Sequence, residues 1–150
     1  MTGLTHQFLG FDVLNRKATI YNGGDLKFNT TTTGTVGAAV VSVLSDPASS
    51  RNQSLRISDF FVTQNEILAV LEAEIGSKFA VTAVDIDRLK EERSLALTRG
   101  EWTLGNIYDV VKACIFGSKS SARWGEDDDS KTLGLPKKDL KEEIKKALDL

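Results

Sequence analysis

The segment from Thr63 to Gly76 has both a helix start and a helix stop, and it constrains the fold more than any other part of the chain. Thr63 and Glu66 have the spacing of a capping box, in which each side chain accepts a hydrogen bond from the other residue's backbone N–H. The apolar positions that follow form a broad stripe, and Gly76 provides a left-handed stop. The sequence therefore predicts a helix that packs a wide apolar face against the rest of the chain.

Three elements are expected before this helix. Residues 18–31 alternate apolar and polar side chains on both sides of the turn-forming residues 22–25, a pattern typical of a β-hairpin. Apolar side chains recur at helical spacing over residues 35–44, ahead of Pro47, which predicts a short and largely buried helix. Residues 54–58 are predicted to form a brief strand.

A strand and two helices are expected after it. Residues 79–84 predict the strand. Asp85 or Asp87 is expected to cap a helix that runs to about residue 98, and Thr103 a second helix that carries an apolar stripe. We expect both helices to face the core.

The last third of the chain changes in composition. Residues 118–135 are rich in serine, glycine and acidic side chains, and they predict a surface loop. The acidic run 126–129 lacks the donor spacing of a calcium loop, so it is interpreted as a solvated part of that loop. Pro136 is expected to open a terminal helix over residues 136–150. Nothing in this pattern indicates a second domain.

Composition excludes several classes of partner. The 150 residues are 41% hydrophobic, and the charged residues nearly cancel to a net charge of -2, so neither nucleic acid nor a membrane is an expected partner. The single cysteine, Cys114, excludes an internal disulfide and a cysteine-based zinc site, and its apolar surroundings predict a buried, inert thiol. Residues 1–14 lack a leader or anchor pattern, so we expect a cytoplasmic protein.

The sequence Gly34-Thr35-Val36-Gly37 resembles part of a dinucleotide-binding glycine loop, because it follows a strand-like segment and opens a helix. The third glycine is missing, and Val40 is branched where close packing of helix on strand requires a small residue. Ordinary packing of a helix start is therefore favoured over a phosphate site.

No catalytic or metal site is predicted. The only histidine, His6, lacks a cysteine or histidine partner for zinc, and Asp12 is near it only in sequence. No Gly-x-Ser-x-Gly elbow is present, so hydrolase chemistry has no support.

Aromatic side chains cluster late in the chain, where they could line a concave pocket for a planar ligand or belong to an ordinary core. Both interpretations stay open. The candidates for a substrate pocket are His6, Phe8, Trp102, Tyr108, Phe116 and Trp124.

Four ordered stretches extend together over most of the chain. They are Thr2-Gly3-Leu4, residues 17–33 with Asn22-Gly23-Gly24-Asp25, residues 58–68, and residues 124–136 with the terminal helix. No single motif among them is diagnostic, but together they resemble the second half of the NmrA-like family of atypical short-chain dehydrogenases, above all its fungal isoflavone-reductase-like members.

The resemblance implies an α/β fold, in which an N-terminal Rossmann half binds NADPH and a smaller C-terminal part encloses the substrate. We expect the chain to be that C-terminal, substrate-binding portion over residues 1–150, with the nucleotide-binding half missing. It then carries no catalytic or cofactor residue and binds no NADPH alone. Residues 55–58 would be a strand of the parallel sheet, residues 79–84 would belong to the substrate part, and apolar surface would be exposed.

Two functions follow from the resemblance. The first is the substrate-binding portion of an NAD(P)-dependent oxidoreductase for a small aromatic or secondary-metabolite substrate, inactive alone. The second is a non-enzymatic, redox-sensing or regulatory module whose protein partner covers the exposed sheet.

Overall fold

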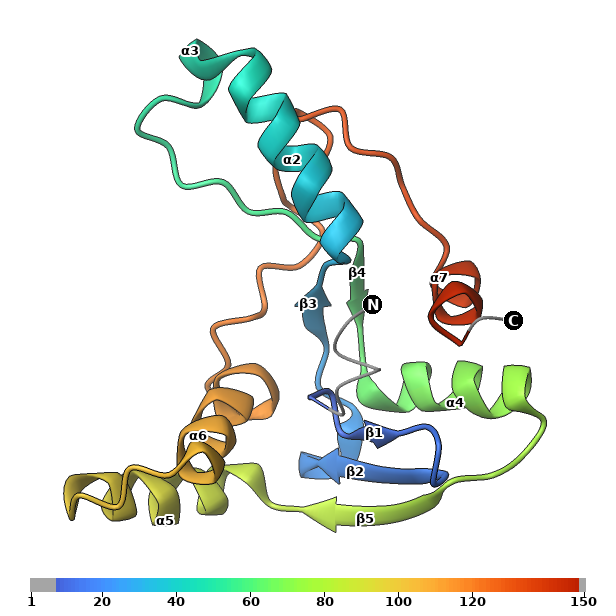
Figure 1. Cartoon of the computed structure of the whole chain (residues 1–150), viewed down its shortest axis with the longest axis vertical. Helices are drawn as coiled ribbons and strands as arrows, with labels where there is room; N and C mark the ends of the chain where they lie inside the picture. The colour runs from blue at the N-terminus through green and yellow to red at the C-terminus, as the bar shows by residue number, and fades with distance from the viewer. Residues whose placement is uncertain (1–7, 149–150) are drawn as a thin grey trace.

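The computed structural model describes residues 8–148, which form two small sheets and a set of surrounding helices (Figure 1). The three-stranded sheet has the order β1-β2-β5, and the two-stranded sheet pairs β3 with β4. The elements are β1 (Phe11–Asp12), β2 (Lys17–Tyr21), the 3₁₀ turn η1 (Asn22–Gly24), β3 (Phe28–Thr30), α2 (Thr33–Ser45), α3 (Pro47–Ser50), β4 (Phe60–Val62), α4 (Gln64–Ile75), β5 (Ala80–Val84), α5 (Ile86–Thr98), α6 (Leu104–Phe116) and α7 (Leu140–Ala147).

The predicted strand over residues 79–84 is confirmed as β5. It pairs in parallel with β2, with Lys17 opposite Ala80 and Tyr21 opposite Val84. On its other side β2 pairs antiparallel with β1. β5 is therefore an edge strand, and four of its five residues are exposed.

The predicted hairpin over residues 18–31 is wrong, because its two strands lie in different sheets. The turn contains Gly23 and Gly24, both with positive φ (80° and 76°), and it directs β3 away from β2 to pair with β4. A side chain at Gly24 would place its Cβ 2.6 Å from Asn65 Oδ1, so the turn also packs tightly on α4. Alternation of side chains indicated strands correctly here, but it did not identify their partners.

The helix predicted from the capping box is confirmed as α4. Thr63 Oγ1 accepts from Glu66 N at 3.0 Å, Glu66 Oε2 accepts from Thr63 N at 2.7 Å, and Gly76 ends the helix with φ 71°. Ile67 and Leu71 on its inner face are fully buried.

Gln64, at the first position of α4, ties this helix to the three-stranded sheet. Its side chain is 1% exposed. The amide oxygen accepts from Tyr21 N at 2.8 Å, and the amide nitrogen donates to Leu9 O and Thr19 O at 2.8 and 3.1 Å. Because unpaired backbone groups are costly inside a fold, these three hydrogen bonds fix α4 to the sheet.

The core lies between the three-stranded sheet, α4, the end of α6 and α7. Phe116 stacks on Tyr21 with ring centroids 5.0 Å apart and meets Phe28 edge to face at 5.0 Å. Ile144 of α7 is fully buried, and α7 packs on α4. The buried cluster consists of Leu9, Phe11, Ala18, Ile20, Tyr21, Phe28, Ile67, Leu71, Phe79, Ile86, Ala113, Phe116 and Ile144.

Helix α2 confirms the helix predicted at residues 35–44, but its expected burial is wrong. Only Thr35 and Ala39 of α2 are buried, whereas Val41 and Leu44 are 65% and 71% exposed. The apolar stripe was interpreted as core-facing, yet it points outward. Exposed apolar surface was itself expected from the resemblance, and the outer side of α2 is one of the places where it occurs.

Helices α5 and α6 pack against each other, and only one face of each turns inward. Leu95 and Leu104 are 57% and 69% exposed, so the expectation that both helices face the core holds for part of each helix. Cys114 is exposed, and the prediction of a buried thiol is wrong because the residue lies on the outer face of α6.

The terminal helix α7 begins at Leu140, where Asp139 accepts from Glu142 N, and not at Pro136 as predicted. Residues 136–138 instead continue the preceding loop. Within residues 8–148, no helix is long and apolar enough to cross a membrane.

Candidate functional site

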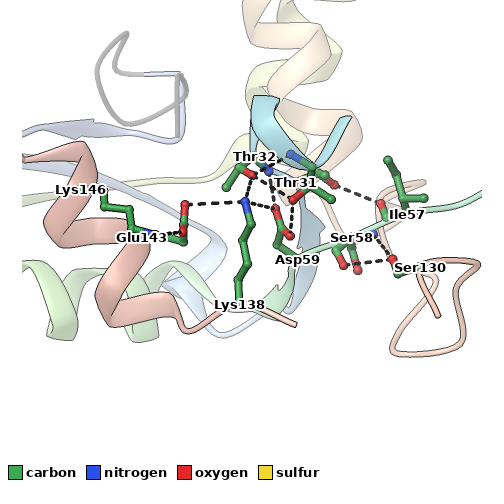
Figure 2. Close-up of polar contacts among 10 residues, drawn as sticks. Thr31, Thr32, Ile57, Ser58, Asp59, Ser130, Lys138, Glu143 and Lys146 are labelled. Carbon is green, nitrogen blue, oxygen red and sulfur yellow. Dashed lines mark hydrogen bonds and ion pairs between the residues drawn. The ribbon is translucent and has the colours of Figure 1, made fainter. Parts of the chain in front are cut away.

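A buried polar cluster forms where the start of α2, the segment before β4 and the C-terminal segment meet (Figure 2). Asp59 lies at its centre with a side chain that is 1% exposed. One carboxylate oxygen accepts from Thr32 N at 2.7 Å and the other from Thr35 Oγ1 at 2.7 Å. A carboxylate so deeply buried requires such donors, because burial of an unpaired charge is costly.

Asp59 supplies the negative charge that the start of α2 attracts. Thr32 caps the helix by accepting from Thr35 N at 3.3 Å, and the Asp59 carboxylate lies beside the same first turn. The partial positive charge of a helix N-terminus favours an anion at this position. Because the protein's own carboxylate is there, a dinucleotide pyrophosphate would meet a like charge at this position. Ordinary helix-start packing at residues 34–37 stays the prediction.

Lys138 connects this cluster to the C-terminal segment. Its Nζ donates to Thr32 Oγ1 at 2.5 Å and lies 3.9 Å from Asp59 Oδ2 and 3.8 Å from Glu143 Oε2 (Figure 2). Glu143 in turn pairs with Lys146 at 2.8 Å. The network thus links α2 and the segment before β4 to α7, which begins only at Leu140, far along the chain from both.

The acidic run makes a second set of contacts next to the first. Asp128 Oδ2 accepts from Ser58 Oγ at 2.7 Å, and Asp129 Oδ2 accepts from Arg56 N at 2.7 Å. Asp129 N donates to Arg56 O at 2.7 Å, so the loop pairs with the edge of residues 54–58. The prediction of a strand at residues 54–58 is wrong. The backbone N–H and C=O groups of this segment bond to the loop and not to a neighbouring strand.

The expectation of a solvated acidic run is therefore correct for half of the run. Glu126 and Asp127 are exposed, whereas Asp128 and Asp129 are partly buried. Burial raises the pKa of Asp128, but hydrogen bonds from Ser58 and Ser130 outweigh this effect and hold its pKa below the usual range.

Asn29 of β3 positions the backbone around Trp124. The Asn29 amide oxygen accepts from Trp124 N and Gly125 N at 3.0 and 3.1 Å, and its nitrogen donates to Gly125 O at 2.6 Å. Trp124 is partly buried, and within the described residues its indole Nε1 has no hydrogen-bond partner. Such a donor is unusual in a folded protein, since buried polar groups are normally paired.

The structure separates the predicted pocket residues. Phe116 is 3% exposed and belongs to the core, and Phe8 packs partly buried against it. Trp102 and Tyr108 are 72% and 51% exposed on the α5 and α6 side. His6 lies outside the described residues. Contact of any of these side chains with a substrate stays a prediction.

A depression of about 320 Å³ lies at the C-terminal end of α4, and none of the predicted pocket residues lines it. Its walls are Ala69, Glu72, Ala73, Gly76, Ser77 and Lys78. The described residues hold no group of three or more histidine, cysteine or carboxylate side chains placed to bind a metal.

Sequence reasoning did not identify Asp59, Lys138 or Asn29 as central residues. Asn29 and Asp59 lie within stretches that carry the resemblance, but neither belongs to a motif with a fixed spacing. Lys138 is 106 residues from Thr32, and a contact of that separation has no local signal.

The chain is similar to curated fungal oxidoreductases, although no protein-family profile matches it. It is 30% identical over 149 residues to oxidoreductase poxI of Penicillium oxalicum, covering 95% of this chain and 46% of the relative. It is 29% identical over 141 residues to oxidoreductase aprR of Aspergillus flavus, covering 94% and 48%. The chain spans about half the length of these relatives.

Solved structures share the fold. An isoflavone reductase matches with a TM-score of 0.65 and 20% identity over 87% of this chain and 43% of its own. A triphenylmethane reductase of Citrobacter sp. matches with a TM-score of 0.65 and 22% identity over 92% and 46%, and a second structure of that enzyme is a complex with NADP(H). The predicted fold class, one part of an isoflavone-reductase-like α/β protein, is confirmed, and so is the resemblance to fungal oxidoreductases.

Proposed function

We propose that this chain, similar over its length to about half of a fungal oxidoreductase, is the substrate-binding portion of an NAD(P)H-dependent reductase. The observation that carries the proposal is the coverage: two fungal relatives named as oxidoreductases match at least 94% of this chain with less than half of their own length. The structural neighbours have names that refer to isoflavones and to triphenylmethane dyes, which supports a small aromatic substrate.

The start of α2 supports the idea that NADPH is held elsewhere. A dinucleotide needs a glycine turn and a free helix N-terminus for its pyrophosphate. In this chain Asp59 accepts from Thr32 N and Thr35 Oγ1 at that position, and a second anion there would be repelled. We therefore propose that this portion neither binds NADPH nor turns over substrate alone. We also propose a cytoplasmic location, because an exposed free thiol such as that of Cys114 stays reduced in the cytoplasm.

Trp124 is the residue we propose to contact the substrate. Its indole N–H is buried without a partner in the described part of the chain, so a ligand carbonyl would satisfy it once the side chain moves to expose the nitrogen. Its ring would offer an apolar surface to a planar compound. The backbone contacts of Asn29 hold the residue in place.

The test is calorimetric titration of the chain with aromatic ketones, together with an assay of NADPH oxidation. We expect saturable ketone binding that Trp124→Ala weakens at least fivefold, and no NADPH oxidation. Trp102→Ala, at a residue that is 72% exposed, is the matched control and should leave binding unchanged. Absence of ketone binding would contradict the substrate role. NADPH oxidation by this chain alone would contradict the proposal that NADPH is held elsewhere.

A regulatory module without catalysis is the second candidate. It is favoured by the exposure of Trp102 and Tyr108 and the burial of Phe116, because residues so separated do not form one aromatic pocket. This function predicts association with a protein partner in the absence of any ketone binding, so the same titration distinguishes the two candidates.

A further inference from the structure

Strand β5 leaves one edge of the three-stranded sheet unpaired. The sheet has the order β1-β2-β5, and β5 lies at the outer boundary of the molecule (Figure 1). Four of its five residues are exposed, and Val81 is 54% exposed. An unpaired edge presents a row of N–H and C=O groups to which another strand can add. The edge of β5 is therefore a candidate surface for pairing with a further strand.

This edge lacks the features that normally prevent such pairing. Natural edge strands are kept short, or they carry charged residues, proline or bulges. The sequence of β5 is Ala-Val-Thr-Ala-Val, with no charge and no proline, and its register with β2 is unbroken from Ala80 to Val84. At the opposite edge of the same sheet, β1 has only two residues. An edge strand of five residues without any of these features is suited to pairing with another chain.

The hydrogen bonds of the sheet identify the groups that face outward. Ala80 N donates to Arg16 O at 2.8 Å, so Ala80 and every second residue after it bond to β2. Because the bonding direction alternates along a strand, the N–H and C=O groups of Val81 and Ala83 face the free edge. Within residues 8–148 these groups have no hydrogen-bond partner.

Backbone groups next to them are already used. Phe79 N donates to Glu72 Oε1 at 3.0 Å, and Asp85 O accepts from Leu89 N at 3.1 Å in the first turn of α5. The residues with both outward groups available are therefore the two that flank the central residue of β5. An added strand has to match these two positions.

We infer that β5 pairs antiparallel with β5 of a second copy of this chain, on a twofold axis at Thr82. In this register Val81 lies opposite Ala83 of the second copy, and each such pair exchanges its N–H···O=C hydrogen bonds. Thr82 then faces Thr82 of the second copy, which is a favourable cross-strand pair. A shift by two residues in either direction would bring a used group, Phe79 N or Asp85 O, into the ladder.

The side chains of β5 favour this occupant. By register and alternation, Val81 and Ala83 lie on the sheet face that carries the buried residues Ala18 and Ile20. In the paired arrangement each exposed Val81 side chain lies next to Ala83 of the second copy, so the apolar face of the sheet continues across the axis. Such burial favours association.

Charge at the two ends of β5 also fits an antiparallel copy. Arg16 and Lys17 are exposed where the strands of the sheet begin, and Asp85 is exposed where β5 ends. Arg88 near that end is paired with Glu92 at 3.0 Å. Antiparallel pairing places the basic end of one copy beside the acidic end of the other, whereas parallel pairing would place like charges together. A surface that complements itself in this way is what a twofold interface requires.

The experiment is disulfide trapping in the purified chain. Thr82→Cys places the thiols of two copies on the axis, where opposed Cα atoms lie about 4.5 Å apart, within the range of a disulfide. Ala83→Cys is the matched control, because its residue is also exposed but the two Cα atoms would be about 8 Å apart, too far for a disulfide. Both variants also carry Cys114→Ser, since the natural thiol is exposed.

We expect the disulfide-linked dimer to form at least fivefold faster at Thr82→Cys than at Ala83→Cys. Equal rates, a faster rate at Ala83→Cys, or no dimer at either position would overturn the inference. The dimer should also persist when Val40→Lys with Val41→Lys makes the outer side of α2 polar. Its loss there would assign the association to α2 and would likewise overturn the inference.

Sedimentation velocity of the chain with its natural cysteine, kept reduced, gives a second readout. Protein concentrations up to about 300 µM are used, because an interface of one strand pair is small. Val81→Lys with Ala83→Lys places charge on the edge and should weaken dimer formation at least tenfold. Leu95→Lys, at a residue that is 57% exposed, should leave it unchanged. Circular dichroism checks that each variant is folded, and unchanged dimer formation in a folded β5 variant would contradict the inference.

Discussion

The carboxylate of Asp59 is almost completely shielded from solvent. Its contribution to the free energy of unfolding therefore depends on the hydrogen-bond donors around it. Asp59→Asn keeps the size of the side chain but removes the charge that faces Thr32 N, Thr35 Oγ1 and Lys138. Because hydrogen bonds to charged groups are stronger than neutral ones, we expect the free energy of unfolding to fall by about 2 kcal/mol. Urea unfolding followed by circular dichroism measures this difference.

The control for Asp59 is Asp127→Asn, which removes an exposed carboxylate from the same chain. It should change the free energy of unfolding by less than about 0.5 kcal/mol. Equal effects of the two substitutions would mean that the buried network contributes nothing beyond net charge.

Asp128 makes the free energy of unfolding depend on pH in the acid range. Its pKa is lower in the folded chain than in the unfolded chain, since hydrogen bonds from Ser58 and Ser130 outweigh the effect of burial. A lowered pKa stabilises the folded state above the ordinary value of an aspartate, about 3.9, and this stabilisation is lost as the pH falls below about 4. Asp128→Asn should therefore be less stable than the natural chain at pH 7.

The measurement for Asp128 is the difference in unfolding free energy between the two proteins at pH 7 and at pH 3. The difference should shrink at pH 3, because the carboxylate of the unfolded chain is largely protonated there and folding with an ionised Asp128 then has to release that proton. Asp87 has a lowered pKa as well, and it affects both proteins equally. A difference in unfolding free energy that stays constant with pH would contradict a lowered pKa of Asp128 in the folded chain.

At the scale of an element, α7 is held by one buried side chain and a set of ion pairs. Ile144 is fully buried, while Lys141 and Lys145 pair with Glu74 of α4 at 3.1 and 3.8 Å. Exposed pairs contribute little, so the apolar contact should dominate. Ile144→Ala is expected to cost about 2 to 4 kcal/mol and to release the helix.

Hydrogen exchange of the α7 amides tests this prediction. Protection should fall in Ile144→Ala and persist in Lys141→Ala, which removes an ion pair to Glu74 of α4 and whose side chain is 58% exposed. Loss of protection in the lysine variant alone would show that charge, not burial, docks the helix.

The elements predicted correctly are those with signals close together in sequence. The capping box at Thr63 and the stop at Gly76 are local, and α4 has those bounds. The hairpin was wrong because the pairing of β2 with β5 depends on residues more than 60 positions apart. The burial of α2 was wrong because an apolar stripe indicates that something covers a helix without indicating which body does so.

At the scale of the whole molecule, the sequence predicted the α/β fold through resemblance, but not the residues that join its parts. Asp59, Asn29 and Lys138 are ordinary polar residues in sequence, and only the fold brings them within hydrogen-bond or ion-pair distance of Thr32, Trp124 and Asp59. Aromatic clustering in sequence likewise did not produce a cluster in space, since Phe116 turns inward and Trp102 outward.

The exposed apolar side of α2, with Val36, Val40, Val41 and Leu44, also predicts how this chain behaves by itself. Val40→Lys with Val41→Lys places two charges at positions that are 51% and 65% exposed, so the free energy of unfolding should change by less than about 0.5 kcal/mol while self-association decreases. Ala39→Lys, one residue away but 7% exposed, buries an uncompensated charge and should cost about 3 kcal/mol or more. Thermal unfolding and sedimentation velocity measure both effects. If the double variant were as unstable as Ala39→Lys, the outer side of α2 would have to be packed within this chain, and its apolar character would need no second body to explain it.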